Sequence, residues 1–389
     1  MDHPRTIFHL DMDAFFAAIA VLDDPALAGK AVLTGGTGPR GVVTTASYEA
    51  RKFGCRSAMP TAQALRLCPH AVCVKVPGAR IRELSQAMFA VLDTFSPRVQ
   101  PLSVDEAFLD MTGTQRLMGE PRAVAQKLKD AVREATGLVA SVGVAPNKFL
   151  AKLASDLEKP DGLTVITADN LDATLTPLAV GKLWGVGPAT QKKLHGRGVK
   201  TIGDLRRLSE AELGDRFGAW GHRLYRLSRG IDDRPVTPGG PPKSVGHEQT
   251  FGENLRTPDD VRAVLLDQAQ QVGLRLRAKH LFARGVTVKI RYGDFQTITR
   301  SVTLAKPSDA TDDLWRAGRG LFDTWAAAGF RSVRLIGLSA GPVTDEPAPA
   351  ELFPDATHER SRQLDAVTDQ IAARFGKRAV RRAGPTGGR

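Results

Sequence analysis

The chain has 389 residues, of which 42% are hydrophobic and 25% charged, and it carries a net charge of +12. Its length predicts about two to four domains, and the lack of both an apolar run of roughly 18 residues and a secretion signal argues against the membrane and secreted classes. Residues 1–166 carry 19 basic and 17 acidic side chains, which leaves +10 for residues 167–389; this excess favours a polyanionic partner, although an anionic membrane surface or simple solubility would also fit it.

The first elements that we predict are a strand over residues 5–11 and a helix over residues 14–22. The strand ends at Asp11, inside an apolar run. A carboxylate in such a run carries a desolvation cost that a metal ion or a cationic partner usually offsets. Asp11 is therefore a candidate ligand for a hard divalent cation.

Three cysteines follow in the next segment. Cys55, Cys68 and Cys73 are odd in number and form neither a C-x-x-C pair nor a disulfide framework. We therefore expect free thiols in a reducing, cytoplasmic compartment.

A second acidic cluster, Asp105 and Glu106, begins 94 residues after Asp11. It interrupts another apolar run, where two strands are predicted to meet within residues 99–111. A helix over residues 121–136 and a buried strand over residues 138–144 come next. Strands and helices that alternate in this way predict an α/β or α+β catalytic core, which we expect to end near residue 166.

Short helices broken by glycines are predicted from residue 167 to residue 235. The segment around Gly185 and Gly187 resembles a helix-hairpin-helix motif, in which helix N-termini present backbone N–H groups to a phosphate without reading base sequence. Lys192 lies one helical turn further on. An ordinary tight turn between two helices is the alternative interpretation of this segment.

Residues 236–243 contain three prolines and two glycines and form the clearest linker in the chain. A separate small α+β domain is predicted after it, at residues 244–341. Apolar and polar side chains alternate along residues 286–292, which is the period of a half-buried strand. Cations on this sheet would contact a phosphate backbone, or they would simply be solvated. These candidate phosphate-contacting cations are Lys289, Arg291 and Arg300.

The tail, residues 342–389, is poor in apolar residues and rich in proline before a helical pattern returns at Leu364, Val367, Ile371 and Phe375. We expect one helix in an otherwise mobile tail.

The three acidic residues predict a site for Mg²⁺, with Mn²⁺ as a plausible substitute, because no histidine or cysteine stands among the candidate ligands. Two such ions about 3.5–4 Å apart would activate an attacking hydroxyl and stabilise a leaving oxygen. Phosphoryl transfer also requires cations around the phosphates. Capping or turn positions are the alternative role for the three carboxylates. The hydroxyl and the cations available near a bound triphosphate belong to Tyr48, Arg51, Lys52 and Lys159.

Five runs of this sequence strongly resemble the Y-family DNA polymerases. They follow one another in the family's order, within a resemblance that extends from residue 5 to about residue 340. Several independent motifs in the same order make a chance match implausible. The runs are residues 9–16, 46–54, 103–110, 141–148 and 154–162.

The resemblance implies a multidomain α+β polymerase of the translesion type with a right-hand-like arrangement of domains. The implied domains are a catalytic palm (residues 1–19 and 78–166), small fingers (20–77), a helical thumb (167–235) and a little finger (244–341).

The resemblance also implies roles for single residues. Phe16 matches the family's steric gate, whose ring clashes with a ribose 2′-OH, although periodicity does not separate it from its neighbour Phe15. Asp13 and Asp110 are given structural roles. The implied metal ligands are Asp11, Asp105, Glu106 and the carbonyl of Met12. The implied triphosphate contacts are Thr45, Tyr48, Arg51 and Lys159.

Two positions depart from the family pattern. Ala20 stands where the family usually has an acid, which removes no ligand. In the tail, residues 349–353 keep the Leu352-Phe353 pair of a sliding-clamp peptide but have proline where glutamine is expected. We therefore predict weak clamp binding at most. The expected partners are primer–template DNA and deoxynucleoside triphosphates, and the expected state is a nucleoid-associated monomer.

Three hypotheses remain. The first is a template-directed DNA polymerase that extends primers past damaged bases. The second is a non-catalytic DNA-binding relative that recruits other factors, against which the retained carboxylates argue. The third is a metal-dependent nuclease joined to a helix-hairpin-helix module, against which we count the lack of a water-activating histidine near either acidic cluster.

Overall fold

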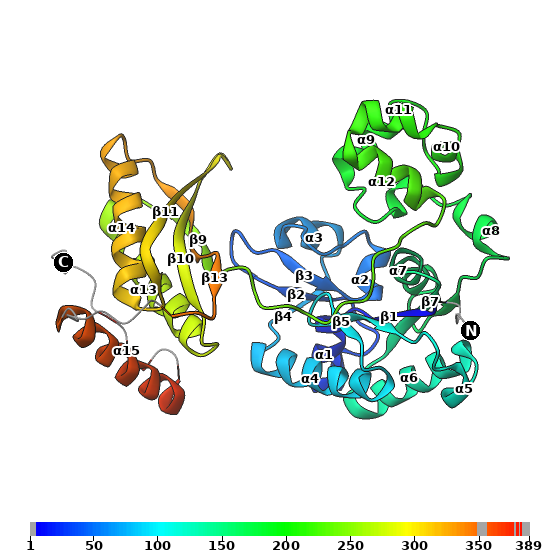
Figure 1. Cartoon of the computed structure of the whole chain (residues 1–389), viewed down its shortest axis with the longest axis horizontal. Coiled ribbons are helices and arrows are strands. Elements are labelled where there is room, and N and C mark those ends of the chain that lie inside the picture. The colour runs from blue at the N-terminus through cyan, green and yellow to red at the C-terminus, as the bar shows by residue number, and fades with distance from the viewer. Residues whose placement is uncertain (1–4, 348–355, 377–378, 381, 383–389) are drawn as a thin grey trace. The chain divides into compact units, whose positions relative to one another are not determined.

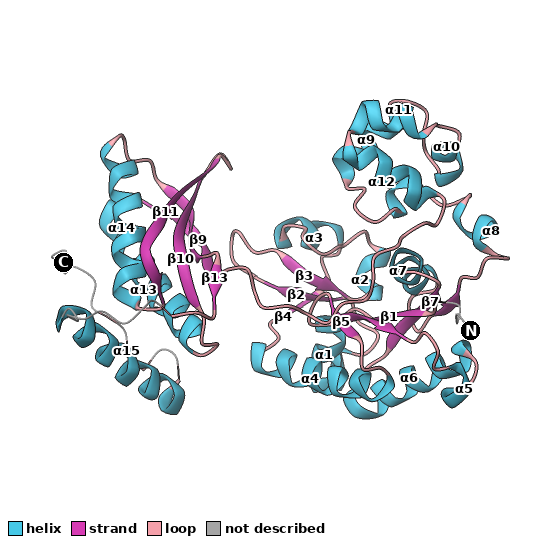
Figure 2. Ribbon diagram, in the orientation of Figure 1, coloured by secondary structure: helices cyan, strands magenta, loops and turns pink. Residues whose placement is uncertain are grey.

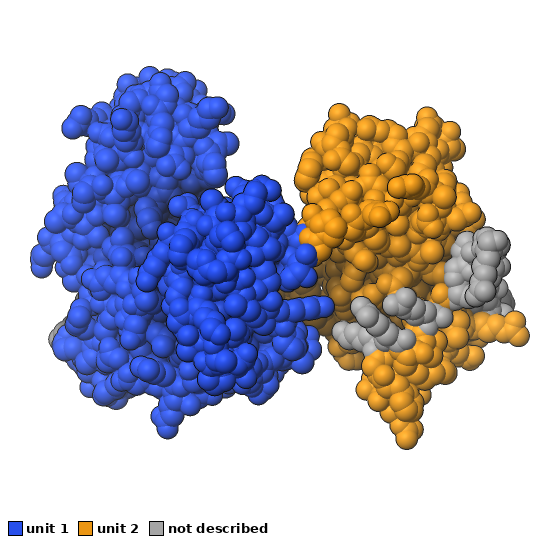
Figure 3. Space-filling model, turned by 180° about the vertical axis from the view of Figure 1, so that it is seen from behind, with its two compact units in different colours: residues 1–37, 41–239 blue, residues 38–40, 240–389 orange. Residues whose placement is uncertain are grey.

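The computed structural model of the chain describes residues 5–347, 356–376, 379, 380 and 382. It divides into two compact units (Figure 3), residues 1–37 with 41–239 and residues 38–40 with 240–389. The division after residue 239 falls inside the proline- and glycine-rich segment. No helix in the described part of the chain is long and apolar enough to cross a membrane.

The first unit is built around a five-stranded sheet with the strand order β5-β6-β1-β7-β8 (Figure 1). The central strand β1 pairs antiparallel with both of its neighbours. Its position in the middle of the sheet explains why residues before and after Asp11 read as a continuous apolar run. The strands are β1 (Ile7–Met12), β5 (Val99–Pro101), β6 (Glu106–Asp110), β7 (Ala140–Ala145) and β8 (Leu163–Val165).

The two faces of this sheet have different neighbours, because successive side chains of a strand point to opposite faces. Phe8 and Leu10 lie in a core formed with helices on one face. Ile7 lies in another core, with Phe149 of the helix α7 (Lys148–Leu157). Asp11 has the same parity as Ile7 and so projects from the α7 face. The helices of the first core are α1 (Phe15–Asp23), α4 (Gly78–Phe95) and α6 (Pro121–Thr136), and the short α5 (Gln115–Met118) precedes α6.

A smaller three-stranded sheet, with the order β3-β2-β4, follows β1 and α1 in the sequence. Cys55 and Cys68 are buried in its core, and all three cysteines are free thiols, as expected. Helix α2 begins after Ser47, whose side chain accepts a hydrogen bond from the Ala50 N–H and caps it. The elements are η1 (Pro25–Leu27), β2 (Val32–Gly35), β3 (Val43–Ala46), α2 (Tyr48–Lys52), α3 (Thr61–Leu67) and β4 (Val72–Val74).

Short helices complete the first unit. Thr201 and Ser209 each form a capping box with an acidic residue three positions later, which explains why such short segments begin helices. Their apolar side chains share one core with α7 and with Ile7 and Phe108 of the five-stranded sheet. The elements are α8 (Leu171–Leu175), η2 (Val180–Lys182), α9 (Pro188–His195), α10 (Ile202–Arg206), α11 (Glu210–Phe217) and α12 (Ala219–Ser228).

The second unit is an antiparallel sheet with the order β11-β10-β12-β9, to which β13 adds by pairing with β10. Helices α13 and α14 lie along one face of this sheet (Figure 2) and share its apolar core. The elements are β9 (Val245–Leu255), α13 (Pro258–Arg277), β10 (Phe282–Tyr292), β11 (Thr297–Ser308), α14 (Thr311–Ala327), β12 (Val333–Ala340) and β13 (Val343–Thr344).

The helix expected in the tail is present as α15 (Ala356–Phe375). Its buried side is polar: Asp365 is 2% exposed and accepts hydrogen bonds from Arg277 and from the Thr311 N–H. Leu364 and Val367, which revealed the helix in the sequence, are 51% and 52% exposed. The buried side is thus decided by charge pairing with α13 and α14 rather than by apolar periodicity. Residues 352 and 353, the candidate clamp peptide, lie outside the described residues.

Candidate active site

Two of the predicted metal ligands lie opposite each other at the ends of neighbouring strands. Asp11 on β1 is the register partner of Glu106 on β6. Paired residues of antiparallel strands have side chains on the same face, so both carboxylates project toward α7. In the described part of the chain, ligand atoms of Asp11, Glu106 and His9 lie within 4.8 Å of one another.

Asp105 and Met12 lie beside this group. Asp105 directly precedes β6, and its carbonyl accepts a hydrogen bond from the Met12 N–H at 3.0 Å. The half-buried Asp105 carboxylate is outside the compact group and accepts a hydrogen bond from Ser103 Oγ. The fold therefore brings the Asp105 main chain to the end of β1, while its side chain is held by the preceding turn.

A lysine contacts each of the two paired carboxylates. Lys159 Nζ contacts Asp11 Oδ1, and it lies 3.4 Å from Asp13 Oδ1. Lys152 Nζ, on α7, contacts Glu106 Oε2. Sequence reasoning missed Lys152. Its place about two helical turns before Lys159 was the available signal.

The carboxyls of Asp11 and Glu106 are both largely buried but have different pKa values. Burial raises the pKa of Asp11 to about 6, against the nearby charge of Lys159. Burial acts in the same direction on Glu106, but contacts with His9 and Lys152 outweigh it and lower the pKa of Glu106 to about 2. Lys159 thus offsets only part of the desolvation cost of ionised Asp11, and a further cation would favour the ionised form of Asp11.

His9 lies beside the two paired carboxylates, although no histidine was counted among the candidate ligands. Its ring is fully buried, with Nδ1 2.7 Å from Ser155 Oγ and Nε2 3.2 Å from Glu106 Oε2. Burial lowers the pKa of His9 to about 4, so the ring is neutral at pH 7. Its parity on β1, two residues before Asp11, was a signal that sequence reasoning overlooked. A ring enclosed in this way supports Glu106 rather than reaching a water molecule.

The Asp13 carboxylate is contacted by more side chains than any of the predicted ligands discussed above. It is 5% exposed, and its carboxylate accepts hydrogen bonds from Tyr48 OH (3.1 Å), from Ser141 Oγ (3.0 Å) and from the Asp161 N–H (2.7 Å). Lys159 Nζ adds the ion pair. Two of the predicted triphosphate contacts, Tyr48 and Lys159, therefore meet on one buried carboxylate.

The remaining predicted triphosphate contacts lie close to Tyr48. The Arg51 guanidinium stands 4.5 Å from the centre of the Tyr48 ring, and Arg51 Nε donates to the Ala46 carbonyl at 3.0 Å. Thr45 is half-buried on β3, where it pairs with Thr34 of β2. Helix α2 thus presents the Tyr48 side chain and the Arg51 guanidinium next to each other.

The structure separates Phe16 from Phe15. Phe15 is 2% exposed and lies in the core that contains Phe8 and Leu10 of the five-stranded sheet. Phe16 is half-buried and lines an open pocket together with Thr44, Lys75 and Ile81. Of the two rings, only that of Phe16 is exposed to a ligand in this pocket.

The predicted DNA contacts are distributed over both units. In the first unit, Gly185 has a positive φ of 96°, and an added Cβ would lie 2.5 Å from the Trp220 ring, so glycine is required there. Gly187 precedes Pro188, the first residue of α9, and Lys192 is exposed on that helix.

In the second unit, the three predicted cations do not share one face. Lys289 pairs with Thr299 and Arg291 with Thr297 across β10 and β11, whereas Arg300 pairs with Val288. Val288 is buried against the helices, so Arg300 projects from the helix side of the edge strand. Lys289 is moreover paired with Glu248, at 2.8 Å. Arg300 therefore does not share a face with Lys289 and Arg291, because the pairing register decides the face.

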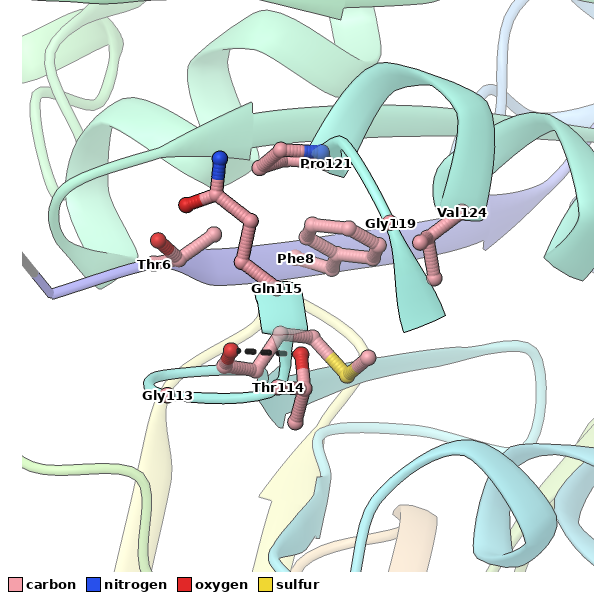
Figure 4. Close-up of a pocket in the computed structure, with 9 residues that line it drawn as sticks. Thr6, Phe8, Gly113, Thr114, Gln115, Gly119, Pro121 and Val124 are labelled. Atoms are coloured by element: carbon pink, nitrogen blue, oxygen red, sulfur yellow. Dashed lines mark hydrogen bonds between the residues drawn. The ribbon is translucent and has the colours of Figure 1, made fainter. Parts of the chain in front are cut away.

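Two other hollows adjoin the five-stranded sheet. One is lined by Asp11, Lys152, Lys182 and Trp184, on the face shared with α7. The other is a small pocket at the opposite end of β1, around Phe8 (Figure 4). There the only hydrogen bond drawn runs from Thr114 Oγ1 to the Met111 carbonyl, 2.8 Å, and no titratable side chain lines the pocket. Only the first of these two hollows belongs to the candidate site.

Comparisons with known proteins agree with this architecture. Family models match residues 10–156 (impB/mucB/samB family), 242–352 (the C-terminal domain of that family) and 181–232 (DNA polymerase-iota, thumb domain). DNA polymerase IV of Desulfatibacillum aliphaticivorans is 42% identical over 378 residues, which cover 96% of this chain and 95% of that protein. DNA polymerase IV of Alkalilimnicola ehrlichii is 44% identical over 346 residues, which cover 88% and 97%.

A solved structure shares the fold. It is a Y-family DNA polymerase chimera with a TM-score of 0.77 and 26% identity, matched over 86% of this chain and 98% of its own. The expected α+β, right-hand-like fold class is thereby confirmed. With relatives above 40% identity along almost the whole of both chains, this chain belongs to the Y-family of DNA polymerases, and DNA polymerase IV is the member to which it is similar.

Proposed function

We propose that this protein adds deoxynucleotides to a primer 3′-OH by two-metal phosphoryl transfer on damaged or distorted templates. Family membership makes the chain a DNA-directed DNA polymerase; the metal mechanism and the kind of template are the proposal. The observation that carries it is the pairing of Asp11 with Glu106 across β1 and β6, beside the cations and hydroxyl that a triphosphate requires.

The residues present fit divalent metal ions. Carboxylate oxygens are the ligands that Mg²⁺ and Mn²⁺ prefer, and the raised pKa of Asp11 marks a buried charge that a cation would stabilise. The proposed ligands are Asp11, Asp105, Glu106 and the Met12 carbonyl. When bound, two such ions would lower the pKa of the primer hydroxyl and neutralise charge on the leaving oxygen.

The protein's own groups would hold the triphosphate in line with the primer end. Lys159 and Arg51 supply positive charge, and Tyr48 and Thr45 supply hydroxyls. Because phosphoryl transfer involves little covalent chemistry by the protein, positioning and charge neutralisation account for most of the acceleration.

Phe16 would select the sugar. Its half-buried ring lines the pocket next to α1, whereas Phe15 is part of the core. A ring under the sugar rejects a ribose because the added 2′-OH has no space, and it leaves deoxyribose unhindered.

The proposed partners are primer–template DNA and deoxynucleoside triphosphates, with a monomeric protein acting at the nucleoid. Gly185, Gly187 and Lys192 would contact the duplex backbone from the first unit, and Lys289 and Arg291 from the open sheet face of the second. Such contacts position DNA without reading its sequence.

The test is single-nucleotide primer extension with Mg²⁺. We expect native protein to extend the primer and the double variant Asp105→Ala/Glu106→Ala to fail. Asp110→Ala is the matched control, because this carboxylate lies on the same strand β6 but bonds to the Thr112 N–H instead of the site; it should extend normally.

Other outcomes identify the rival functions. Salt-sensitive DNA binding without extension by the native protein would indicate a non-catalytic relative, and primer shortening would indicate a nuclease. A template with an abasic site separates the translesion part of the proposal: extension that stops at the lesion, while continuing on intact template, would refute it.

A further inference from the structure

We infer that Asp13 is a positioning residue that holds the triphosphate-binding groups of this polymerase in place. This inference rests on the proposed function and extends it to a residue that sequence reasoning treated as structural. Asp13 does not belong to the compact group of Asp11, Glu106 and His9. Its contacts join three parts of the first unit that are far apart in the sequence.

The first contact fixes the segment that carries Lys159. Asp13 Oδ2 accepts the Asp161 N–H at 2.7 Å, two residues after Lys159. Ser141 reinforces this, because its Oγ donates to Asp13 and accepts the Gly162 N–H at 3.0 Å. The main chain after Lys159 is therefore tied directly to β1, which also carries Asp11.

The second contact fixes the start of helix α2. Tyr48 OH donates to Asp13 Oδ1 at 3.1 Å, and the Tyr48 ring carries the Arg51 guanidinium 4.5 Å from its centre. Asp13 thus joins both sources of positive charge proposed for the triphosphate, Lys159 directly and Arg51 through Tyr48.

The chemistry of the carboxylate suits this role. An ionised carboxylate has about four acceptor sites, and Asp13 uses them for two hydroxyls, one N–H and one ammonium. Asp13 is 5% exposed, and charged hydrogen bonds inside a protein are stronger than neutral ones. A buried anion with several partners orders those partners before the ligand arrives, which lowers the entropy cost of binding.

The hydrogen bond from Tyr48 OH to Asp13 also allows the opposite expectation for nucleotide binding. The single proton of Tyr48 OH points either to Asp13 or to a phosphate oxygen, since both are acceptors. If Asp13 mainly competed with the triphosphate for Tyr48 and Lys159, its removal would tighten nucleotide binding. The contacts to Ser141 and the Asp161 N–H favour positioning, because neither group is among the proposed triphosphate contacts.

The experiment measures the Kd of the templated deoxynucleotide in a ternary complex with the full chain and a dideoxy-terminated primer–template. Asp13→Asn keeps the shape but removes the charge, and we expect it to weaken nucleotide binding on the order of tenfold or more. Ser141→Ala is the matched control. It removes a neutral partner of the same carboxylate, so it should weaken nucleotide binding by less than about threefold, while thermal unfolding records the stability of both variants.

A mutant cycle with Lys159→Met supplies a readout that a purely structural role would not change. Because Asp13 acts partly through Lys159 and partly through Tyr48, adding Asp13→Asn to Lys159→Met should weaken binding by clearly less than it does in the native background. Unchanged or tighter binding by Asp13→Asn would overturn the inference. So would a loss that adds fully to that of Lys159→Met.

These results are distinct from failure of the proposed function. Native protein that neither binds a templated nucleotide nor extends a primer would remove both proposals. Native protein that extends normally, with either of the contrary results for Asp13→Asn, would remove the positioning role alone.

Discussion

Replacing Gly143 by alanine should loosen the helix that supports the candidate active site. Gly143 lies on β7 under α7, and a Cβ there would stand 2.0 Å from the Ala151 carbonyl oxygen and 2.3 Å from the Ser155 nitrogen. Both atoms belong to the main chain of α7, so rotation of a side chain cannot relieve the contact. Real Cβ contacts start near 3.0 Å, so the helix and the strand must separate by about 1 Å, the difference between 3.0 and 2.0 Å.

This separation should lower both stability and activity. Overpacking of this kind costs typically up to about 3 kcal/mol, which for a unit of this size corresponds to a fall in Tm of roughly 6–12 °C. Helix α7 also carries Lys152, which contacts Glu106, and Ser155, which bonds His9. Misplacement of supporting groups by about 1 Å can cost on the order of a hundredfold in rate.

The assays are chemical denaturation and single-nucleotide incorporation. Gly78→Ala is the matched control in the same unit: Gly78 begins α4 and has open space around its Cβ position, so this variant should be as stable as the native protein or slightly more so. If Gly143→Ala were as stable and as active as Gly78→Ala, the close approach of α7 to β7 would be wrong, and with it the support that we assign to α7.

Three further predictions concern other parts of the chain. Phe16→Ala should admit ribonucleotides, with discrimination against them reduced by about tenfold or more; unchanged sugar selection in competitive incorporation would remove Phe16 from the gate. Burial by itself raises the pKa of the Asp232 carboxyl, but hydrogen bonds with Arg234 outweigh it and hold that pKa below its usual range. The stabilising contribution of Asp232 is therefore present above the unfolded-state pKa of about 3.9 and is lost as pH falls through the lower folded-state pKa. Asp232→Asn should accordingly lower stability at pH 7 and reduce its loss in acid, and denaturation curves that keep the native pH dependence would contradict this. Asp365→Ala leaves Arg277 with one fewer partner in a buried network and should release α15; hydrogen exchange that stays slow across this helix would show that its polar face does not hold it.

Much of the site could be predicted from the sequence, because the patterns that identify its residues are local. The parity of β1 and the position of Glu106 at the start of β6 follow from apolar runs of a few residues, and the family resemblance assigned Lys159 and Tyr48 before any contact was known. The same local reasoning distinguished neither Phe15 from Phe16 nor a buried from an exposed face of α15.

Contacts between distant residues depended on the tertiary structure. The partners of Asp13 lie 35, 128 and 148 residues away in the sequence, and no periodicity or spacing relates them to it. The register of β10 with β11 likewise turned Arg300 away from Lys289. The amino-acid sequence by itself determined which carboxylates, cations and rings this polymerase possesses and on which elements they lie. Only the folded chain decided which of them share a buried environment, because the energy of a charged side chain depends on the neighbours that folding brings to it.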